Sequence, residues 1–425
     1  MFKNTWINRI HSKEAKDAFY LFLLQCVDKI LPLLVLPYLM VTLGAEKYGY
    51  VGFSFALIQY LSMFVDFGFG LSATKRIAVA KTQGRDALNR IFCATFYAKC
   101  ILLLVGTTIV LVALLVIVPI SQYLVTVLYS YPLVLGTTLT LSWFYQGIGK
   151  IRIVALITSV CRILVLPLIF IFVKTEMDYN IAALVQALVY LLAGFIAIWV
   201  IQQMRLVSFV AVSFHDIRVE LKESCPLFLS SVATSMYTQL FTLILGIIST
   251  PIVVGRYAAA ERIVRSLCFA IYSPISTSFY PKVATIGVTN KFAAEKLVKK
   301  IAVFSFLIML CLSVVLFVFA LPLSELLGKD YGNLSVLIKI MSIAPVFIAL
   351  GAILGQMGLI ALGNQHTKML FLRVYVTGAF FSLLLVVILA PILVEIGASI
   401  AMVLTEIFVF TFMYYYYRKS RRCLH

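Results

Sequence analysis

Four long stretches of the sequence contain no charged side chain, namely 101–149, 179–204, 224–255 and 301–324. A helix needs about 20 apolar residues to cross the hydrocarbon layer of a bilayer, and every stretch is long enough. Of the 425 residues, 63% are hydrophobic and 12% are charged, whereas roughly a quarter are charged in soluble domains. The sequence therefore predicts an all-α integral membrane protein.

Apolar segments recur from one end of the chain to the other and predict about twelve transmembrane helices. The expected helices lie at approximately 19–43, 50–72, 91–118, 122–147, 153–173, 180–202, 225–248, 257–280, 301–326, 333–362, 368–391 and 396–417. The longest polar stretches between them, 73–90, 203–224 and 281–300, are expected to be amphipathic helices at the membrane surface that serve as connectors.

Basic residues in the predicted loops alternate strongly between the two sides of the membrane. About 24 lie on one side, and only Lys47, Lys174, Arg256 and Lys329 lie on the other. Positive residues concentrate in cytoplasmic loops, so both termini are predicted to be cytoplasmic. The net charge of +18 is thereby explained without nucleic acid as a partner.

The two halves of the chain share one spacing. Tyr50 to Lys75 and Tyr257 to Lys282 each span a predicted helix and are equally far apart. We therefore expect an N-terminal lobe over 1–202, a cytoplasmic connector over 203–224 and a C-terminal lobe over 225–425. In transporters built from parallel repeats of this kind, the substrate path lies between the halves.

Motifs for catalysis, cofactors and metals are missing from the sequence. There is no phosphate-binding GxxxxGK[ST] loop, no HExxH and no GxSxG. The four histidines are scattered over predicted loops and termini, and seven of the eight cysteines lie within or beside apolar segments. The sequence predicts neither an enzyme nor a metal or cofactor site, and the predicted outer loops are too short for a membrane glycosyltransferase.

Ionisable residues inside the predicted spans are the informative ones, because each costs at least about 2.5 kcal/mol in the hydrocarbon. Cations outnumber anions among them, and this excess favours an anionic cargo such as a phosphate or pyrophosphate. The predicted substrate-binding residues are Lys29, Arg162, Arg262, Arg265, Lys339 and Arg373.

Some of these charges have structural alternatives. Glu261 and Arg265 are four residues apart and would form an intrahelical pair, which leaves Arg262 as the freer cation. Lys339 and Arg373 lie near predicted helix ends, where they would also reach the headgroups. Lys99 is similar. The carboxylates of Asp28, Asp66 and Glu406 are predicted to couple transport to an ion or to pair with these cations.

Stretches at the start of each half resemble a known family. The first comprises LPLLVLPYLMVTLG at 31–44 and YGYVGFSFALIQYLSMFVDFGFGLSATKRIA at 48–78. The second comprises PLFLSSVATSMYTQLFTLILG at 226–246 and GRYAAAERIVRSLCFAIYSPISTSFYPKVA at 255–284. Both resemble the polysaccharide-transporter family of O-antigen and oligosaccharide flippases, for which VDFGF with SATKRIA is fairly specific.

The resemblance implies two six-helix lobes around a central cationic cavity in the bacterial inner membrane. Such proteins are thought to flip undecaprenyl-pyrophosphate-linked repeat units to the periplasmic leaflet by alternating access, with a proton or sodium gradient as a candidate energy source. Membrane lipids, and the polymerase and chain-length proteins of the same pathway, are the implied partners. On this reading the pyrophosphate would meet Lys29, Arg162, Arg262 or Arg265, positions inferred here from depth and charge.

The main alternative is a multidrug or small-molecule exporter of the same superfamily. An exporter of cationic drugs would place carboxylates at mid-depth, whereas this sequence has an excess of arginine and lysine there. A flippase for the cell-wall precursor lipid II is a further alternative, for which the chain is somewhat short.

Overall fold

The fold is known from a computed structural model that describes residues 13–363 and 365–422. Within these ranges, the side chains outside the description are those of 13–30, 33, 226, 230, 231, 233–239, 277, 281, 284, 288, 329, 365 and 422. The described chain is helical and contains no strand. Its longest helices are α2 (Lys13–Asp66), α4 (Arg85–Val116), α11 (Tyr179–Gln203), α12 (Phe214–Ile248), α13 (Pro251–Thr289), α14 (Lys291–Leu327) and α17 (Gln365–Arg422).

Two of these helices each contain two of the predicted spans. In α2 the backbone of Gly44 departs from helical geometry, with φ 67° and ψ 172°. Glycine adopts such a positive φ without a steric penalty from a Cβ atom. In α17 the change of direction occurs at Val394, with φ 50° and ψ −124°. Each of the predicted pairs, 19–43 with 50–72 and 368–391 with 396–417, is therefore two helices that meet at one non-helical residue.

Other predicted spans are built from shorter helices in series. These helices are α5 (Val118–Ser121), α6 (Leu124–Ser130), α7 (Pro132–Leu139), α8 (Ser142–Gly147), α9 (Ile151–Val165), α10 (Leu168–Phe172), α15 (Leu334–Met341), α16 (Ala344–Ile353) and the π-helix η3 (Leu354–Ala361). Pro132 begins α7 and Pro167 separates α9 from α10. Proline lacks the backbone N–H that a continuous helix needs, which explains these breaks. Two short 3₁₀ turns, η1 (Glu176–Asp178) and η2 (Lys329–Tyr331), lie in the connections.

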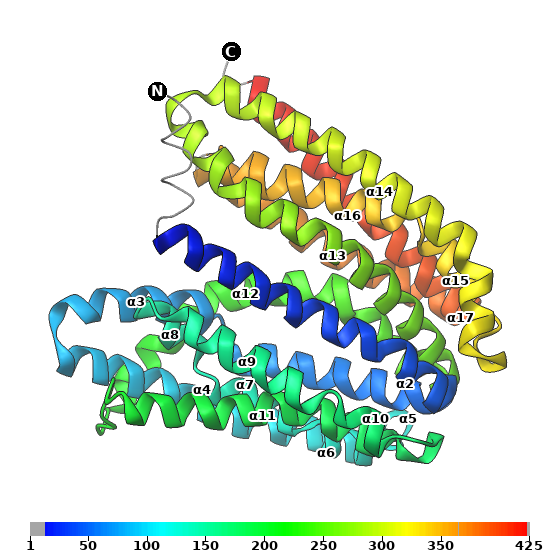
Figure 1. The fold of residues 1–425 in the computed structure, drawn as a ribbon, viewed down its shortest axis with the longest axis horizontal. Coiled ribbons are helices and arrows are strands. Elements are labelled where there is room, and N and C mark those ends of the chain that lie inside the picture. Colours follow the sequence, from blue (N-terminus) through cyan, green and yellow to red (C-terminus); the bar gives the residue numbers. More distant parts are fainter. Residues whose placement is uncertain (1–12, 364, 423–425) are drawn as a thin grey trace.

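The helices form two groups that come together at one end of the molecule and diverge toward the end where α2 begins and α17 ends (Figure 1). The N-terminal group contains α3 (Phe69–Gln83) to α11, and the C-terminal group contains α13 to α17. Helices α2 and α12 each contact both groups, and the most extensive packing between elements joins α2 to α13. The site described below lies at this α2–α13 contact.

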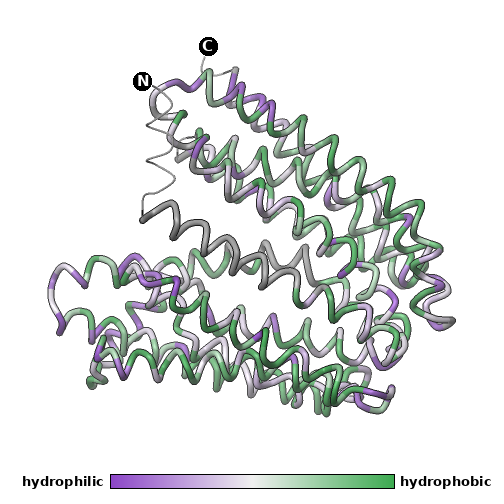
Figure 2. Tube along the Cα trace, in the orientation of Figure 1, coloured by the Kyte–Doolittle hydropathy of each residue, from purple (hydrophilic) through white to green (hydrophobic). Residues whose placement is uncertain are grey.

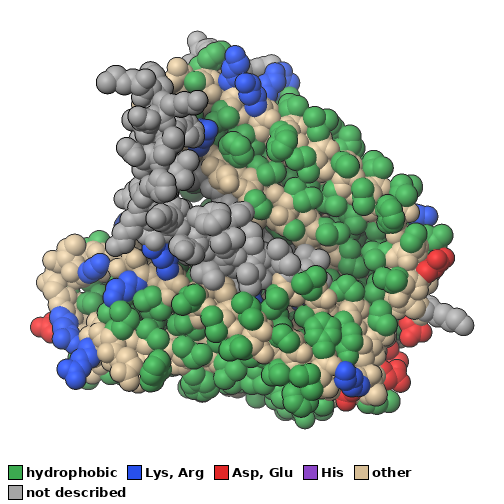
Figure 3. Space-filling view, viewed as in Figure 1, with side chains coloured by type: hydrophobic (Ala, Val, Ile, Leu, Met, Phe, Trp, Pro, Cys, Tyr) green, Lys and Arg blue, Asp and Glu red, His purple; other side chains and the backbone are tan. Residues whose placement is uncertain are grey.

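Hydrophobic residues cover the length of the helices, as the hydropathy colouring shows (Figure 2). Many apolar side chains point outward, for example Leu104 at 70% and Val118 at 79% exposure. On the face in Figure 3, most Lys and Arg gather at the diverging end, and most Asp and Glu at the opposite end. Among the described residues, eight helical segments are long and apolar enough to cross a membrane. The prediction of an all-α membrane protein is confirmed, while the count of about twelve spans stays a prediction.

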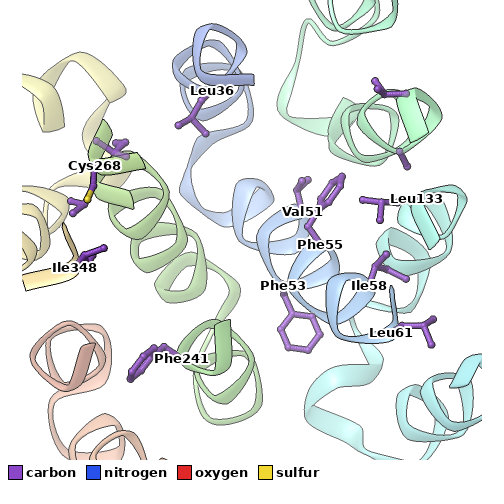
Figure 4. Close-up of a cluster of buried hydrophobic side chains, with 14 of the residues drawn as sticks. Leu36, Val51, Phe53, Phe55, Ile58, Leu61, Leu133, Phe241, Cys268 and Ile348 are labelled. Atoms are coloured by element: carbon purple, nitrogen blue, oxygen red, sulfur yellow. The ribbon is translucent and has the colours of Figure 1, made fainter. Parts of the chain in front are cut away.

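The core lies where the second half of α2 meets its neighbours. Val51, Ile58 and Leu61 point from α2 toward Leu133 and nearby helices, and Phe241 of α12 belongs to the same cluster (Figure 4). Phe53 stacks on Tyr123 with ring centroids 4.0 Å apart. This packing places the second half of α2 in contact with both groups.

The predicted connector 203–224 has no helix of its own. Residues 205–213 form an irregular segment, and α12 begins at Phe214 and continues without interruption to Ile248. Ser213 caps α12, since its side chain accepts a hydrogen bond from the backbone N–H of Asp216. The division into lobes over 1–202 and 225–425 stays a prediction, because α12 packs against both groups.

Candidate functional site

A cavity of about 250 Å³ lies between the second half of α2 and α13. It contains three charged side chains, Glu261, Arg262 and Arg265, all on α13. The remaining lining residues are Tyr48, Gly52, Phe55, Ala56, Gln59, Thr242, Ala258 and Ser266. We call this cavity the central pocket. Its walls come from α2 on one side and from α12 and α13 on the other.

A smaller cavity of about 80 Å³ adjoins the central pocket on the side of the N-terminal group. The two cavities share Phe55, Gln59 and Arg262 as lining residues. The smaller one adds Arg162 from α9 and Tyr190 from α11. The fold therefore brings Arg162 and Arg262, which are 100 positions apart in the sequence, to the wall of the same smaller cavity at the junction of the two groups.

Arg162 is held against an aromatic ring. Its guanidinium carbon lies 5.7 Å from the centroid of Tyr190, and its Nη2 lies 3.5 Å from the Tyr190 hydroxyl. A cation over an aromatic face is stabilised by the ring's negative face, and arginine favours such stacking. Gln186, one turn before Tyr190, supplies a buried amide whose Nε2 donates to the carbonyl of Ala182 at 3.1 Å.

Arg265 has two carboxylate partners. Its Nε lies 3.0 Å from Glu261 Oε1, four residues earlier in α13, and its Nη1 lies 3.3 Å from Glu406 Oε1 of α17. The Thr242 hydroxyl donates to Glu261 Oε2 at 3.3 Å. The predicted Glu261–Arg265 intrahelical pair is present, and the structure adds Glu406 to it.

Asp66 pairs with Lys99, the structural alternative named above. The Nζ of Lys99 lies 3.0 Å from Asp66 Oδ1; the Lys99 side chain is 4% exposed and that of Asp66 is 49% exposed. The next residues, Phe67 and Gly68, have φ of 42° and 79° and end α2. Phe67 stacks on Phe228 of α12, so the VDFGF stretch forms a break packed on α12.

The other predicted site residues lie elsewhere or outside the description. Lys339 is exposed, with its Nζ 5.8 Å from the centroid of Phe317. Arg373 is exposed on α17. Neither lines the two cavities, so binding of cargo by either stays a prediction. The side chains of Asp28 and Lys29 lie outside the described residues.

Uncharged polar residues of the site were not singled out from the sequence. They are Tyr48, Gln59, Thr242, Ser266, Gln186 and Tyr190. The two glutamines carried a usable signal, since an amide in an apolar span is costly unless it has a partner or a cavity. For metals, no group of three or more His, Cys, Asp or Glu side chains that could hold an ion is present in the described part of the chain.

Comparison with known proteins places the chain in a family. The family described as "Polysaccharide biosynthesis protein" matches residues 15–286. A protein of Escherichia coli (strain K12) is 32% identical over 408 residues, covering 96% of this chain and 97% of the relative. The chain belongs to the polysaccharide biosynthesis protein family. The prediction of polysaccharide-family membership is thereby confirmed.

Two relatives of the chain are both described as "Putative O-antigen transporter". They are the Escherichia coli relative and a Shigella dysenteriae protein that is 27% identical, covering 94% of this chain and 98% of the relative. The prediction of a transporter rather than an enzyme is confirmed by these relatives and by the family.

Solved structures of transporters have the same fold. The lipid II flippase MurJ in an inward closed conformation superimposes with a TM-score of 0.72 at 14% identity, covering 93% of this chain and 87% of that chain. An inward-facing multidrug resistance transporter of the MATE family superimposes with a TM-score of 0.65 at 15% identity, covering 93% and 96%. The family member described here is thus a multi-pass membrane protein with a transporter fold.

Proposed function

We propose that this protein is a flippase that moves an undecaprenyl-pyrophosphate-linked O-antigen or surface-polysaccharide repeat unit from the cytoplasmic to the periplasmic leaflet by alternating access. The observation that carries the proposal is that Arg162 and Arg262, from different helices, both line one cavity between the two helix groups. Guanidinium groups match the charge and geometry of pyrophosphate oxygens, and two of them from different helices could hold one such group. The names of the relatives support a sugar-bearing cargo.

The balance of charge around the two cavities supports an anionic cargo over a cationic drug. Their charged lining residues are three arginines, Arg162, Arg262 and Arg265, against the single carboxylate of Glu261. That carboxylate is already paired with Arg265. A multidrug exporter remains the alternative function, and it would require a carboxylate available to a cation.

Membrane location and orientation form part of this proposal. We place the protein in the bacterial inner membrane with both termini in the cytoplasm. The basic residues at the diverging end of the helix groups support that orientation, because positive residues favour the cytoplasmic side. Polymerase and chain-length proteins that act on the same lipid-linked unit are proposed partners.

Deletion of the gene in its host tests the proposal. Surface polysaccharide is extracted and separated on a gel, with and without the gene restored on a plasmid, and the lipid-linked unit is measured in each leaflet. The flippase predicts loss of the polymer ladder, its return on complementation, and accumulation of the unit on the cytoplasmic leaflet. A normal ladder together with altered resistance to cationic compounds would instead indicate an exporter.

A further inference from the structure

Two buried glutamates share one arginine at the central pocket. The side chains of Glu261, Arg265 and Glu406 are 11%, 14% and 5% exposed, and both carboxylates lie within 3.3 Å of the guanidinium. If both carboxylates were ionised, this cluster would hold one uncompensated negative charge. Burial of an unpaired charge costs several kcal/mol, so such a site favours neutralisation of one carboxylate.

Among the described side chains, the other groups that interact with Glu261 or Glu406 are neutral. Thr242 comes from α12, Tyr257 and Cys268 lie on α13, and Tyr60 comes from α2. Arg262 lines the same pocket, yet the ion pairs of the described residues join neither glutamate to it. Among the described side chains, Arg265 is therefore the cation that pairs with these two carboxylates.

The hydrogen bonds distinguish the two glutamates. Glu261 uses both of its oxygens, one toward Arg265 and one as acceptor from Thr242. Glu406 uses only Oε1, at the longer distance of 3.3 Å from Arg265, and the hydrogen bonds of the described residues leave its Oε2 unused. An ionised carboxylate is stabilised by the donors it accepts from, so Glu406 is the less stabilised anion.

We propose that Glu406 binds a proton and that the Glu261–Arg265–Glu406 cluster is a proton-exchange site of the protein. The central pocket supplies a route, since Glu261 and Arg265 line it directly. A metal cation fits less well, because hard cations take about six oxygen ligands and the cluster has one unused carboxylate oxygen. Any link between this proton and cargo movement rests on the proposed flippase function, whereas the proton site itself does not.

Infrared difference spectroscopy of the purified full-length protein tests the site without cargo. Every protein in this comparison carries Glu220→Gln, because burial raises the pKa of the Glu220 carboxyl to about 7 and would add a second protonated acid. In this background the otherwise wild-type protein is expected to show, at neutral pH, the C=O band of a protonated carboxylic acid. Glu406→Gln removes it, and Glu261→Gln also removes it because one glutamate then remains for one arginine. Glu406→Asp shifts the band, since the proton resides on that side chain, whereas Glu261→Asp leaves its position nearly unchanged.

Glu395 provides a matched control on the same helix. Its side chain is 8% exposed, and its Oε1 lies 3.8 Å from Nη1 of Arg256. Glu395 therefore has an arginine that it does not share with a second glutamate among the ion pairs of the described residues. Glu395→Gln is therefore expected to leave the band unchanged. Absence of the band in the otherwise wild-type protein, its persistence in Glu406→Gln, or its loss when sodium replaces potassium would overturn the proposal, and a shift in Glu261→Asp alone would overturn the assignment to Glu406.

A second measurement connects the site to transport. In the deletion strain, Glu406→Gln is expected to reduce export at least about tenfold with normal protein in the membrane, and collapse of the proton gradient should reduce wild-type export likewise. If wild-type protein fails to restore the ladder at all, the flippase function is wrong while the infrared result stands. Export by Glu406→Gln at the wild-type level would overturn the role of this proton in transport.

Discussion

Gly49 of α2 and Gly255 of α13 lie backbone against backbone where the two helix groups meet. A Cβ atom on Gly49 would lie 1.8 Å from the carbonyl oxygen of Pro251, and one on Gly255 would lie 1.7 Å from the carbonyl oxygen of Ala45. Neither backbone atom can move as a side chain would. One turn further, a Cβ atom on Gly52 would lie 3.1 Å from the Cβ of Ala258, and both of these residues line the central pocket.

Alanine at this crossing is predicted to force α2 and α13 apart. In Gly49→Ala or Gly255→Ala, the new methyl carbon would lie less than 2 Å from a backbone oxygen of the other helix. The helices would have to separate until this distance exceeds about 3.4 Å, where ordinary contact begins. We expect loss of export and a lower melting temperature of the detergent-purified protein. Gly351→Ala is the control, because its Cβ would meet Phe410 at an ordinary 3.6 Å. Equal melting temperatures for all three variants would contradict the crossing as a tight contact.

Removal of either pocket arginine is predicted to abolish export without removing the protein from the membrane. Arg162→Ala and Arg262→Ala each delete a charge that faces the shared space, whereas lysine at either position should retain more activity because it keeps the charge. Lys299→Ala, at an exposed position on α14, is the control. The measurement is the polysaccharide ladder of the complemented deletion strain. Wild-type ladders in both alanine variants would exclude these residues as the cargo site and leave the flippase function intact.

The Asp66–Lys99 pair is predicted to be structural. Asp66→Asn leaves the buried Lys99 ammonium without its partner, so it should destabilise the protein. The loss should be smaller than the roughly 3 to 5 kcal/mol of a fully buried pair, since Asp66 is half exposed. Asp66→Asn with Lys99→Met should recover part of that stability. Thermal unfolding of the wild type, Asp66→Asn, Lys99→Met and the double variant gives the coupling energy. Additive effects would show that the two side chains do not interact.

Glu220 is predicted to make stability depend on pH. Its Oε1 lies 3.0 Å from Arg76 of α3, before the uncharged stretch of α12, and burial raises the pKa of this carboxyl to about 7. A raised pKa means that the folded protein binds the proton more readily than the unfolded chain, whose glutamate titrates near 4.3. The stabilisation is therefore complete below about pH 4 and is lost as pH rises through about 7.

Glu220→Gln should flatten that dependence. Wild type and variant are compared by thermal unfolding from pH 4.5 to 8, and the variant should gain on the wild type as pH rises. Glu325→Gln is the control, because Glu325 lies at an exposed position on α14. Parallel curves for wild type and Glu220→Gln would contradict the role of Glu220.

Local patterns in the sequence were sufficient for the class of protein and for the approximate positions of its helices. Hydropathy acts over about 20 residues, so 91–118 and 301–326 could be read directly and correspond to α4 and α14. The break inside 122–147 was harder to read, since Leu141, with φ 50°, has no special residue type to mark it. The break at Val394, by contrast, falls between the predicted spans 368–391 and 396–417.

By itself, the sequence determined which charges had to be explained, because every ionisable group in an apolar span needs a cavity or a partner. Only the tertiary structure decided between the two. It placed Arg162 and Arg262 on one space, gave Asp66 to Lys99, and set Glu406 beside Arg265 across 141 positions of sequence. The physical reason is range: burial cost depends on a residue and its immediate neighbours, whereas partners are chosen by the packing of whole helices.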